Sequence, residues 1–428
     1  MKAAAVLTVF FISNYLYASY PETEGISQGG DSHIIGVFAA RESRPDLHLL
    51  ASEAGIMIYN IHYSSSLDSH QNCLRNVYML AHGKDGLEWH LVKQAPLPNL
   101  IYDYSFLKNR KKSRKKMANA LKHKLKEQGI PFMNDPSLVS KVSSKKEFAV
   151  AMKQAELSHP ETHNYSEKNI SDLLEKYGFV FVKPTYGSGG KGILKIERDA
   201  TQKNKFNLAV NLPKNAILPK QVFIEPISDV SLFRKAHFKD VDYFELLLII
   251  HYLKNNFFQQ FQDNYIVQQG IRSFSLSGKK CDLRVTTQRN EDNKIVITGS
   301  ILRVGENISQ GGYFANPSII LEFAQGETEK LINDAYKLAL RAHAAMESLI
   351  PGKYFAELGS DIVFDKSMSP VIIEANAKPG YISIFENYGQ QLMDGKAGEL
   401  HRYLTNMDQM RNKTILGYSF YLKSVLAL

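Results

Sequence analysis

The chain has 428 residues, of which 44% are hydrophobic and 22% charged, and this globular composition and length predict two or three domains. Its formal net charge of +9 favours an anionic partner, either nucleic acid, an anionic lipid surface or a small polyanion such as ATP. Two cysteines are too few for a cysteine metal cluster or a disulfide framework, and they fit a reducing compartment.

Residues 1–32 are predicted to be an N-terminal extension. A single lysine, an apolar run and the small residues Ala18 and Ser19 give it a weak resemblance to a secretory signal, and a misplaced start codon is the alternative explanation. No later segment reaches the roughly 20 apolar residues of a membrane span. FELLLII, over Phe244–Ile250, is too short and is expected to belong to the core.

Residues 33–137 are predicted to form a small α/β domain. Its strand candidates are HIIGVFAA after Ser32, IMIYNIHY over Ile56–Tyr63, and NLIYDYS around Tyr102.

A basic segment follows these strands, with Lys or Arg at six of the seven positions 110–116. Met117, Leu121 and Leu125 recur at a spacing of four, which favours a helix whose basic face is solvated. A nucleic-acid or membrane contact is the alternative, although no aromatic side chains interleave to stack on bases.

A glycine-rich stretch comes next, in which residues 181–198 read FVKPTYGSGGKGILKIER. Gly187, Gly189 and Gly192 satisfy G-x-G-x-x-G, a pattern of phosphate-binding loops. In a dinucleotide-binding fold this loop leads into a helix, whereas ILKIER alternates as a strand. The Walker A motif is excluded because Lys191 precedes Gly192 instead of Ser or Thr, and the chain has no kinase H-R-D or D-F-G motif.

The loop is therefore predicted to be a hairpin that folds over phosphates. Glycine backbone amides can wrap anionic oxygens because no Cβ stands in the way. Lys183, on the strand before the loop, carries a flexible ammonium that can reach a phosphate or an adenine nitrogen.

Three strands and one long helix are predicted in the second half of the chain. The helix, ETEKLINDAYKLALRAHAAMESLI, has apolar positions at Leu331, Ala335, Leu338, Ala342 and Met346. The strands are YIVQQGI, KCDLRVTTQR and KIVITGSILRVG, and we expect them to share one sheet with the two strands described next.

A metal site is predicted where SDIVFDKSMSPVIIEANAKPG reads as strand, turn, strand. Residues i and i+2 of a strand share a face, so Glu374 and Asn376 point the same way. With a turn over residues 366–370, the antiparallel register places Asp361 roughly opposite Glu374. Three oxygen donors then converge on a buried strand, and Mg²⁺ takes such ligands together with phosphates and water.

A glycine hairpin with a preceding lysine, a hinge and then D…E-x-N, in this order from Lys141 to Gly380, resembles the ATP-grasp superfamily. YIVQQGI, DLRV, ILRVG, NISQGG and EANAKPG are similar to motifs of the YheC/YheD-type family, which is named for endospore coat-associated proteins. The resemblance implies an ATP-grasp fold of the α/β (α+β) class, with two α+β subdomains that clasp ATP after a small α/β domain. The subdomains would span residues 138–265, with the glycine hairpin, and 266–400, with the Mg²⁺ site, before a C-terminal tail over 401–428.

The same resemblance implies roles for individual residues. Lys141 and Lys183 would be the two ATP lysines. The loop and the interdomain hinge would supply the rest of the ATP site, namely Gly187, Ser188, Gly189, Gly190, Lys191, Gly192, Gln268, Gln269, Gly270 and Ile271. Asp361, Glu374 and Asn376 would hold one or two Mg²⁺ ions, with Mn²⁺ as an alternative. The catalytic set would be Arg284, Arg303, Asn307 and Lys378, with Gln310, Gly311 and Gly312 lining the same cavity.

Two of these roles have alternatives. Arg284 could form a structural pair with Asp282, which lies two residues away on the same strand. Lys378 stands where related ligases commonly have a small residue, and it could bind a substrate carboxylate or phosphate.

The implied activity is an ATP- and Mg²⁺-dependent ligase that joins a carboxylate to an amine through an acylphosphate, with an amino acid or peptide among its substrates. The alternative is an ATP-binding structural or assembly protein of a spore layer with little or no catalysis. Nucleic acid is not an expected partner. Because ATP-dependent chemistry belongs inside the cell, we expect a cytoplasmic or spore-associated protein, with export as the minority alternative.

Overall fold

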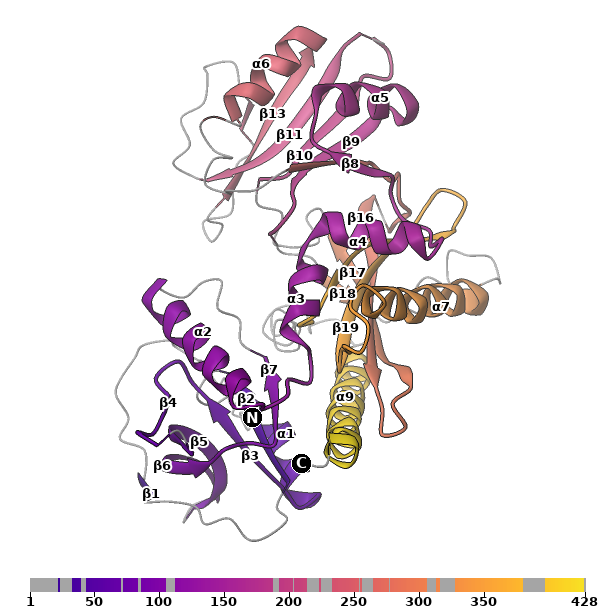
Figure 1. The fold of residues 1–428 in the computed structure, drawn as a ribbon. Helices are drawn as coiled ribbons and strands as arrows, with labels where there is room; N and C mark the ends of the chain where they lie inside the picture. The colour runs from indigo at the N-terminus through magenta and orange to yellow at the C-terminus, as the bar shows by residue number, and fades with distance from the viewer. Residues whose placement is uncertain are drawn as a thin grey trace, which may run out of the picture. The chain divides into compact units, whose positions relative to one another are not determined.

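A computed structural model of the chain describes residues 22–23, 33–39, 44–70, 72–83, 86–104, 112–187, 192–202, 204–213, 223–224, 233–253, 255, 265–276, 278–305, 313–315, 328–379 and 397–426. The chain divides into two compact units, Met1–Ile130 and Pro131–Leu428. Both units combine helices with β-sheet, so the fold belongs to the α+β class, as predicted (Figure 1).

The described residues of the first unit form one mixed sheet and two helices. Its strands follow the order β1-β6-β5-β3-β2-β7, with β4 paired to β5. The elements are β1 (Glu22–Thr23), β2 (His33–Phe38), α1 (Pro45–Glu53), β3 (Ile56–Ile61), β4 (Ser66–Leu67), β5 (Cys73–Gly83), β6 (Gly86–Pro96), β7 (Leu100–Asp103) and α2 (Lys112–Glu127).

The predicted strands of this unit are confirmed as β2, β3 and β7. Strand β2 pairs in parallel with both of the others, and all six of its residues are buried. A continuous apolar run such as HIIGVF is typical of a parallel strand that is covered on both faces. Gly36 is needed in this strand because a Cβ would lie 2.7 Å from Cδ1 of Ile61.

The basic segment forms helix α2, as its periodicity predicted. Leu121 and Leu125 are buried, whereas Met117 is 53% exposed. The Nζ atom of Lys122 lies 2.8 Å from a carboxylate oxygen of Asp103 at the end of β7. One face of α2 is thus anchored to the unit.

In the second unit, the part of the chain that the structure describes forms two sheets. The first follows the order β12-β13-β11-β10-β9-β14-β8 and the other β18-β17-β16-β19-β20, with β15 paired to β16. Its elements up to the hinge are α3 (Pro136–Ser143), α4 (Lys145–Gln154), β8 (Thr162–Asn164), α5 (Glu167–Tyr177), β9 (Phe179–Pro184), β10 (Leu194–Arg198), β11 (Phe206–Pro213), β12 (Phe223–Ile224), β13 (Phe233–Val241), α6 (Tyr243–Leu253) and β14 (Tyr265–Gln269). Those after it are β15 (Ser275–Leu276), β16 (Lys279–Arg289), β17 (Ile295–Gly305), β18 (Tyr313–Ala315), α7 (Thr328–Glu347), β19 (Glu357–Phe364), β20 (Pro370–Asn376) and α9 (Ala397–Leu426).

The core of the first sheet includes helix α5, which packs against β9 and its neighbouring strands. Ser166 caps the start of the helix by accepting a hydrogen bond from the Asn169 amide, and Gly178 ends it with a φ of 68°. Apolar residues of α5 pack against Val180, Val182 and other residues of the sheet. YIVQQGI was expected in the sheet of the metal site, and that prediction is wrong: it forms β14 and pairs with β8 and β9.

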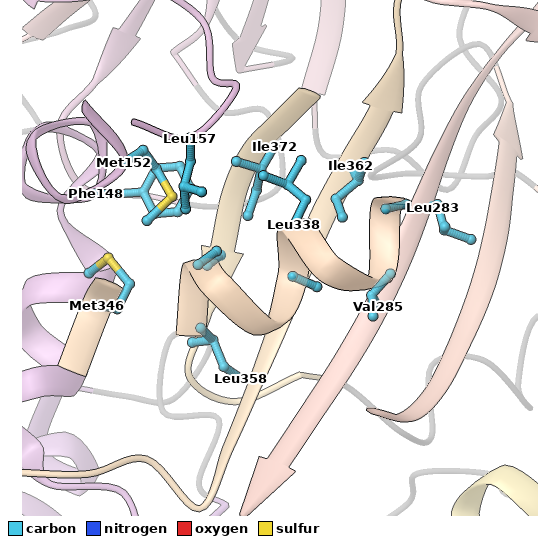
Figure 2. Packing of buried hydrophobic residues seen from close by; sticks show 14 of the residues in the cluster. Phe148, Met152, Leu157, Leu283, Val285, Leu338, Met346, Leu358, Ile362 and Ile372 are labelled. Carbon is cyan, nitrogen blue, oxygen red and sulfur yellow. The ribbon is translucent and has the colours of Figure 1, made fainter. Parts of the chain in front are cut away.

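The second core lies between the β16–β19–β20 strands and helices α3, α4 and α7 (Figure 2). Helix α7 spans the predicted amphipathic segment, and four of its five apolar positions are buried, with Leu331 partly buried. Figure 2 shows residues from α4, α7 and the strands facing one another, among them Met152, Leu338, Leu283, Ile362 and Ile372.

The segment from Lys141 onward does not form a single helix, because the chain breaks at Ser144. This residue has an extended conformation, ends α3 and caps the start of α4 through its side chain. The amide of Lys145 donates to the carbonyl of Thr185 at 2.9 Å, so the start of α4 is tied to the strand that leads into the glycine loop.

Two further helices lie where the sequence carried weak signals. In α6, Leu246 and Ile250 are buried, as expected of FELLLII, but Phe244 is 70% exposed. Residues expected as a C-terminal tail form most of the 30-residue helix α9. Among the described residues, no helix combines the length and apolar character that crossing a membrane requires.

Candidate active site

Strands β9 and β10 form the predicted glycine hairpin. They pair antiparallel, with Leu194 opposite Val182. Gly187 and Gly192, at the two ends of the loop, have φ values of 139° and 67°, which L side chains rarely adopt. Ser188, Gly189, Gly190 and Lys191 lie outside the described residues. The loop therefore returns as a strand and does not enter a helix, which confirms the hairpin.

Lys183 lies on β9 on the face that lines a cavity, together with Phe179 and Phe181. Its Nζ atom donates to Oε1 of Gln268 at 2.7 Å and lies 4.7 Å from the centre of the Phe181 ring. Burial lowers the pKa of Lys183 to about 8, and the nearby Glu374 carboxyl partly opposes this shift. The lysine is thus a cation held in a partly apolar wall.

The cavity has a volume of about 570 Å³. Drug-sized ligands bind in clefts of about 300–1,000 Å³ whose mainly apolar walls carry a few placed polar groups. Its walls combine apolar residues with the charged groups described below, and include Phe179, Phe181, Lys183, Ile193, Lys195, Glu197, Gln268, Gln269, Ile271, Arg272, Lys280, Asp282, Arg303, Asp361, Ile373 and Glu374. Both sheets of the second unit contribute to this lining.

The predicted hinge, Gln268–Ile271, borders the cavity at the end of β14. The side-chain oxygen of Gln269 already has a hydrogen-bond partner, because its Oε1 accepts from the Glu161 amide at 3.1 Å. A Cβ on Gly270 would lie 2.2 Å from Cδ1 of Phe179, so only glycine fits against this ring. The amide of Gly270 donates to the Phe179 carbonyl at 2.8 Å.

The structure brings Lys145, and not Lys141, to the glycine loop. Lys145 donates to the Gly187 carbonyl at 2.9 Å, and its charge acts on the pKa values of both Lys183 and Glu374. Lys141 lies at the end of α3, where its Nζ atom is 3.2 Å from Glu147, and its side chain is 40% exposed. The sequence signal that was missed is the start of a new helix after Ser144.

The β19–β20 hairpin places the predicted metal ligands as expected. Asp361 is opposite Glu374, and Gly359 is opposite Asn376. Asp361 is buried, and its carboxyl group shares a hydrogen bond with Glu374. Burial raises the pKa of Glu374, and the Asp361 charge raises it further.

Two arginines neutralise Asp361. Arg284 binds it through Nε and through Nη2, the latter at 2.9 Å, and Nη2 of Arg303 lies 2.9 Å from the same carboxylate. Burial by itself would raise the pKa of Asp361, but the two guanidinium groups outweigh it and hold the pKa below its ordinary value. Arg284 therefore pairs across strands with Asp361, and the alternative pairing with Asp282 is not formed.

Asp282 is instead the partner of Arg303. Nε of Arg303 lies 2.5 Å from one carboxylate oxygen, and Nη2 binds the other. Asp282 is 3% exposed and lines the cavity. Burial raises its pKa to about 6, although Arg303 opposes the shift. Sequence reasoning did not assign Asp282 to the site.

The donor set around Asp361 fits a divalent cation. Two carboxyl groups share a hydrogen bond in a buried place, and the pKa of one is raised by the charge of the other, a repulsion that a cation would relieve. Among the described residues, no three His, Cys, Asp or Glu side chains form a metal-binding group. The third oxygen donor that the sequence predicted is the Asn376 amide, which lies opposite Gly359 on the same hairpin.

Of the remaining predicted residues, the structure describes only Lys378. Lys378 is half-buried in the turn after β20 and is not part of the cavity lining. Asn307, Gln310, Gly311 and Gly312 lie outside the described residues.

The sequence matches one protein family over most of the second unit. The family, described as YheC/D-like ATP-grasp, matches residues 129–406. The endospore coat-associated protein YheD of Bacillus subtilis (strain 168) is 23% identical over 341 residues, which cover 77% of this chain and 64% of that protein. The chain thus spans less than two thirds of the length of this curated relative.

Solved structures resemble the chain only distantly. ATP-grasp ligase PsnB, complexed with a minimal precursor, is 12% identical with a TM-score of 0.43, covering 88% of this chain and 99% of that one. D-cycloserine synthetase DcsG is 11% identical with a TM-score of 0.48, covering 90% and 99%. Biotin carboxylase from Campylobacter jejuni is 11% identical with a TM-score of 0.49, covering 89% and 71%.

Proposed function

The chain belongs to the YheC/D-like ATP-grasp family, and from this premise we propose that it is an ATP- and Mg²⁺-dependent ligase that joins a carboxylate to an amine through an acylphosphate. The observation that carries the proposal is the composition of the cavity. A lysine, a pair of buried carboxyl groups and arginine line one space of about 570 Å³. Phosphoryl transfer needs such positioning and charge neutralisation more than covalent help from the protein.

The proposed ATP site lies between the glycine hairpin and the hinge. Lys183 and Lys145 bind the phosphates or the adenine edge, and we assign the backbone amides of the glycine loop to the phosphates. The apolar walls at Phe181, Ile193 and Ile373 support the adenine ring. Lys145 takes the place of Lys141 in this assignment because it contacts the loop.

The proposed metal ligands are Asp361, Glu374 and Asn376. A Mg²⁺ ion bound there would supply charge neutralisation of the ATP phosphates. Arg284 and Arg303 bind carboxylates through Nε and Nη2, so we assign their Nη1 groups to the γ-phosphate. Asp282 holds Arg303 in place for this contact.

The reaction has two steps. A carboxylate oxygen of the substrate attacks the γ-phosphorus, the bond between this phosphorus and the β–γ bridging oxygen breaks, and ADP leaves. The nitrogen of an amine then attacks the acyl carbon, the bond to the phosphate oxygen breaks, and inorganic phosphate leaves while the nitrogen loses a proton. Closure of the glycine loop would exclude water from the acylphosphate.

The test is a product screen. Purified protein, ATP, Mg²⁺ and a pool of amino acids and peptides should release phosphate together with a new amide detected by mass spectrometry. The variant with Glu374→Ala and Asn376→Ala should release none, and unchanged turnover would rule out the metal assignment.

A second candidate is an ATP-binding structural or assembly protein. The name of the relative, an endospore coat-associated protein, favours it. The same screen separates the two candidates: tight ATP binding without turnover on any carboxylate supports the structural role, and an amide product supports the ligase.

A further inference from the structure

The turn that follows β20, the strand of the proposed ligands Glu374 and Asn376, is held in place by residues outside the β19–β20 hairpin. Residues 377–379 come directly after Asn376. Asn134, which is 2% exposed, donates from Nδ2 to the Ala377 carbonyl at 2.5 Å. Its Oδ1 accepts a hydrogen bond from the Glu357 amide at 3.1 Å, which ties the turn to the start of β19.

Helix α9 holds the same turn at a second point. Nη2 of Arg411 lies 3.3 Å from the Pro379 carbonyl and 3.2 Å from Oε2 of Glu357. The Arg411 and Glu357 side chains are each 1% exposed. A buried ion pair is weak evidence for stability, because apolar residues of similar volume often stabilise as well or better. The pair therefore calls for a reason other than stability.

The turn is in contact with the residues of the proposed site. Gly359 is opposite Asn376 across the β19–β20 hairpin. A Cβ on Gly359 would lie 2.7 Å from Cβ of Pro379 and 3.3 Å from Cδ of Arg284. Pro379 thus packs over Gly359 beside Arg284, and a shift of the turn would move both Asn376 and the space that Arg284 occupies.

We propose that Arg411 of helix α9 is a positioning residue that, through the Pro379 carbonyl and Glu357, fixes the end of the metal-binding strand and the place of Arg284. The inference rests on the proposed function. Arg411 lies beyond residues 129–406, so the match to the family does not include it. The C-terminal helix is then part of the site's framework.

The experiment compares two double variants that each replace both charged residues of a buried ion pair by neutral side chains. Arg411→Met with Glu357→Gln removes the contact to the turn. The matched control, Arg289→Met with Glu347→Gln, removes the buried pair between Arg289 of β16 and Glu347 of α7, whose other side-chain hydrogen bonds go to Asn293 and Phe355 and not to the turn. For each protein we would measure Mn²⁺ binding by titration, ATP binding in EDTA, and thermal unfolding.

The Arg411 variant should bind Mn²⁺ about tenfold more weakly than wild type, the lower end of what the loss of a group behind a metal ligand causes. The control should bind Mn²⁺ like wild type, and ATP binding in EDTA should be unchanged in both. Equal Mn²⁺ affinities in the Arg411 variant and wild type, or equal losses in the two variants, would overturn the inference. A wild-type protein that binds ATP but no Mn²⁺ would overturn the proposed function as well.

Arg411→Lys provides a second variant if the double variant does not fold. It keeps a charge beside Glu357, but a flexible ammonium replaces the planar guanidinium whose Nη2 holds both the Pro379 carbonyl and Glu357. An intermediate Mn²⁺ affinity with unchanged thermal unfolding supports positioning. Wild-type Mn²⁺ affinity in this variant contradicts it.

Discussion

Lys183 combines burial with a charge that nucleotide binding requires. Burial lowers its pKa to about 8, so in the free protein the ammonium loses its proton as the pH rises through this value. A bound phosphate stabilises the charged form. ATP affinity should therefore fall as the pH rises above about 8.

Calorimetric titration of ATP between about pH 6.5 and 9.5 measures this fall. Lys183→Arg should weaken binding at neutral pH but remove the dependence, because a guanidinium keeps its charge over this range. If wild-type affinity stays constant across pH 8, the lysine does not bind the nucleotide as a cation.

Lys145 and Lys141 make a matched pair for testing the loop assignment. Lys145→Met should weaken ATP binding about 10- to 100-fold, the loss expected for one hydrogen bond to a charged group. Lys141→Met should change it by no more than about twofold, because its exposed pair with Glu147 contributes little. Equilibrium binding of a fluorescent ATP analogue decides between them, and a larger loss for Lys141 would restore the original assignment.

At the scale of elements, the predictable parts of the site are local in sequence. The glycine hairpin and the β19–β20 hairpin each join strands separated by a short turn. Alternation of side chains therefore sufficed to place Asp361 opposite Glu374. The sequence also placed Lys183 on the strand before the loop, which the structure shows as β9.

The parts that escaped prediction depend on contacts between distant segments. Arg284 pairs with Asp361 because β16 lies beside β19, and the sequence does not show which strands are neighbours. The sequence also gives no sign of the register shift at Thr286/Thr287 in the β16–β17 pair. YIVQQGI has the composition of any buried strand, which does not say which sheet it joins. Arg411 lies in a helix that carries no motif.

Strand β14 and the hinge after it depend on the close approach of Gly270 to the Phe179 ring, and this approach can be tested. Gly270→Ala would place a Cβ 2.2 Å from the Phe179 ring. Overpacking of this kind destabilises by about 1–3 kcal/mol, and the ring would also shift in the cavity wall. We expect a lower melting temperature together with weaker ATP binding.

Phe179→Leu combined with Gly270→Ala should recover part of both losses, because the smaller side chain leaves room for the methyl group. Thermal unfolding and ATP titration of the single and double variants test this coupling. Additive losses in the double variant would show that the two residues do not meet as described.

At the scale of the whole molecule, basic side chains gather in two regions, the cavity of the second unit and helix α2 of the first. The cavity of the second unit gathers Lys183, Lys195, Arg272, Lys280 and Arg303 around a volume suited to a small ligand. Helix α2 of the first unit presents basic residues on an exposed face. The charge of the molecule thus allows a small polyanion at one region and an extended one at the other.

The binding properties of the two regions can be distinguished by substitutions in α2 and by the salt dependence of oligonucleotide binding. Replacing Lys116, Lys124 and Lys126 on the exposed face of α2 by Gln should leave ATP affinity and turnover unchanged. Any binding of a fluorescent oligonucleotide by the wild type should be non-specific and fall by orders of magnitude between about 50 and 200 mM salt, because it depends on counterion release.

Fluorescence anisotropy with the oligonucleotide and calorimetry with ATP, run on the same two proteins, measure both quantities. Oligonucleotide binding that persists at about 150 mM salt and is lost in the α2 variant would make nucleic acid a partner of the first unit. A parallel loss of ATP affinity would mean that the basic face of α2 acts on the cavity. With neither effect, the basic residues of α2 contribute to solvation and bind neither anion.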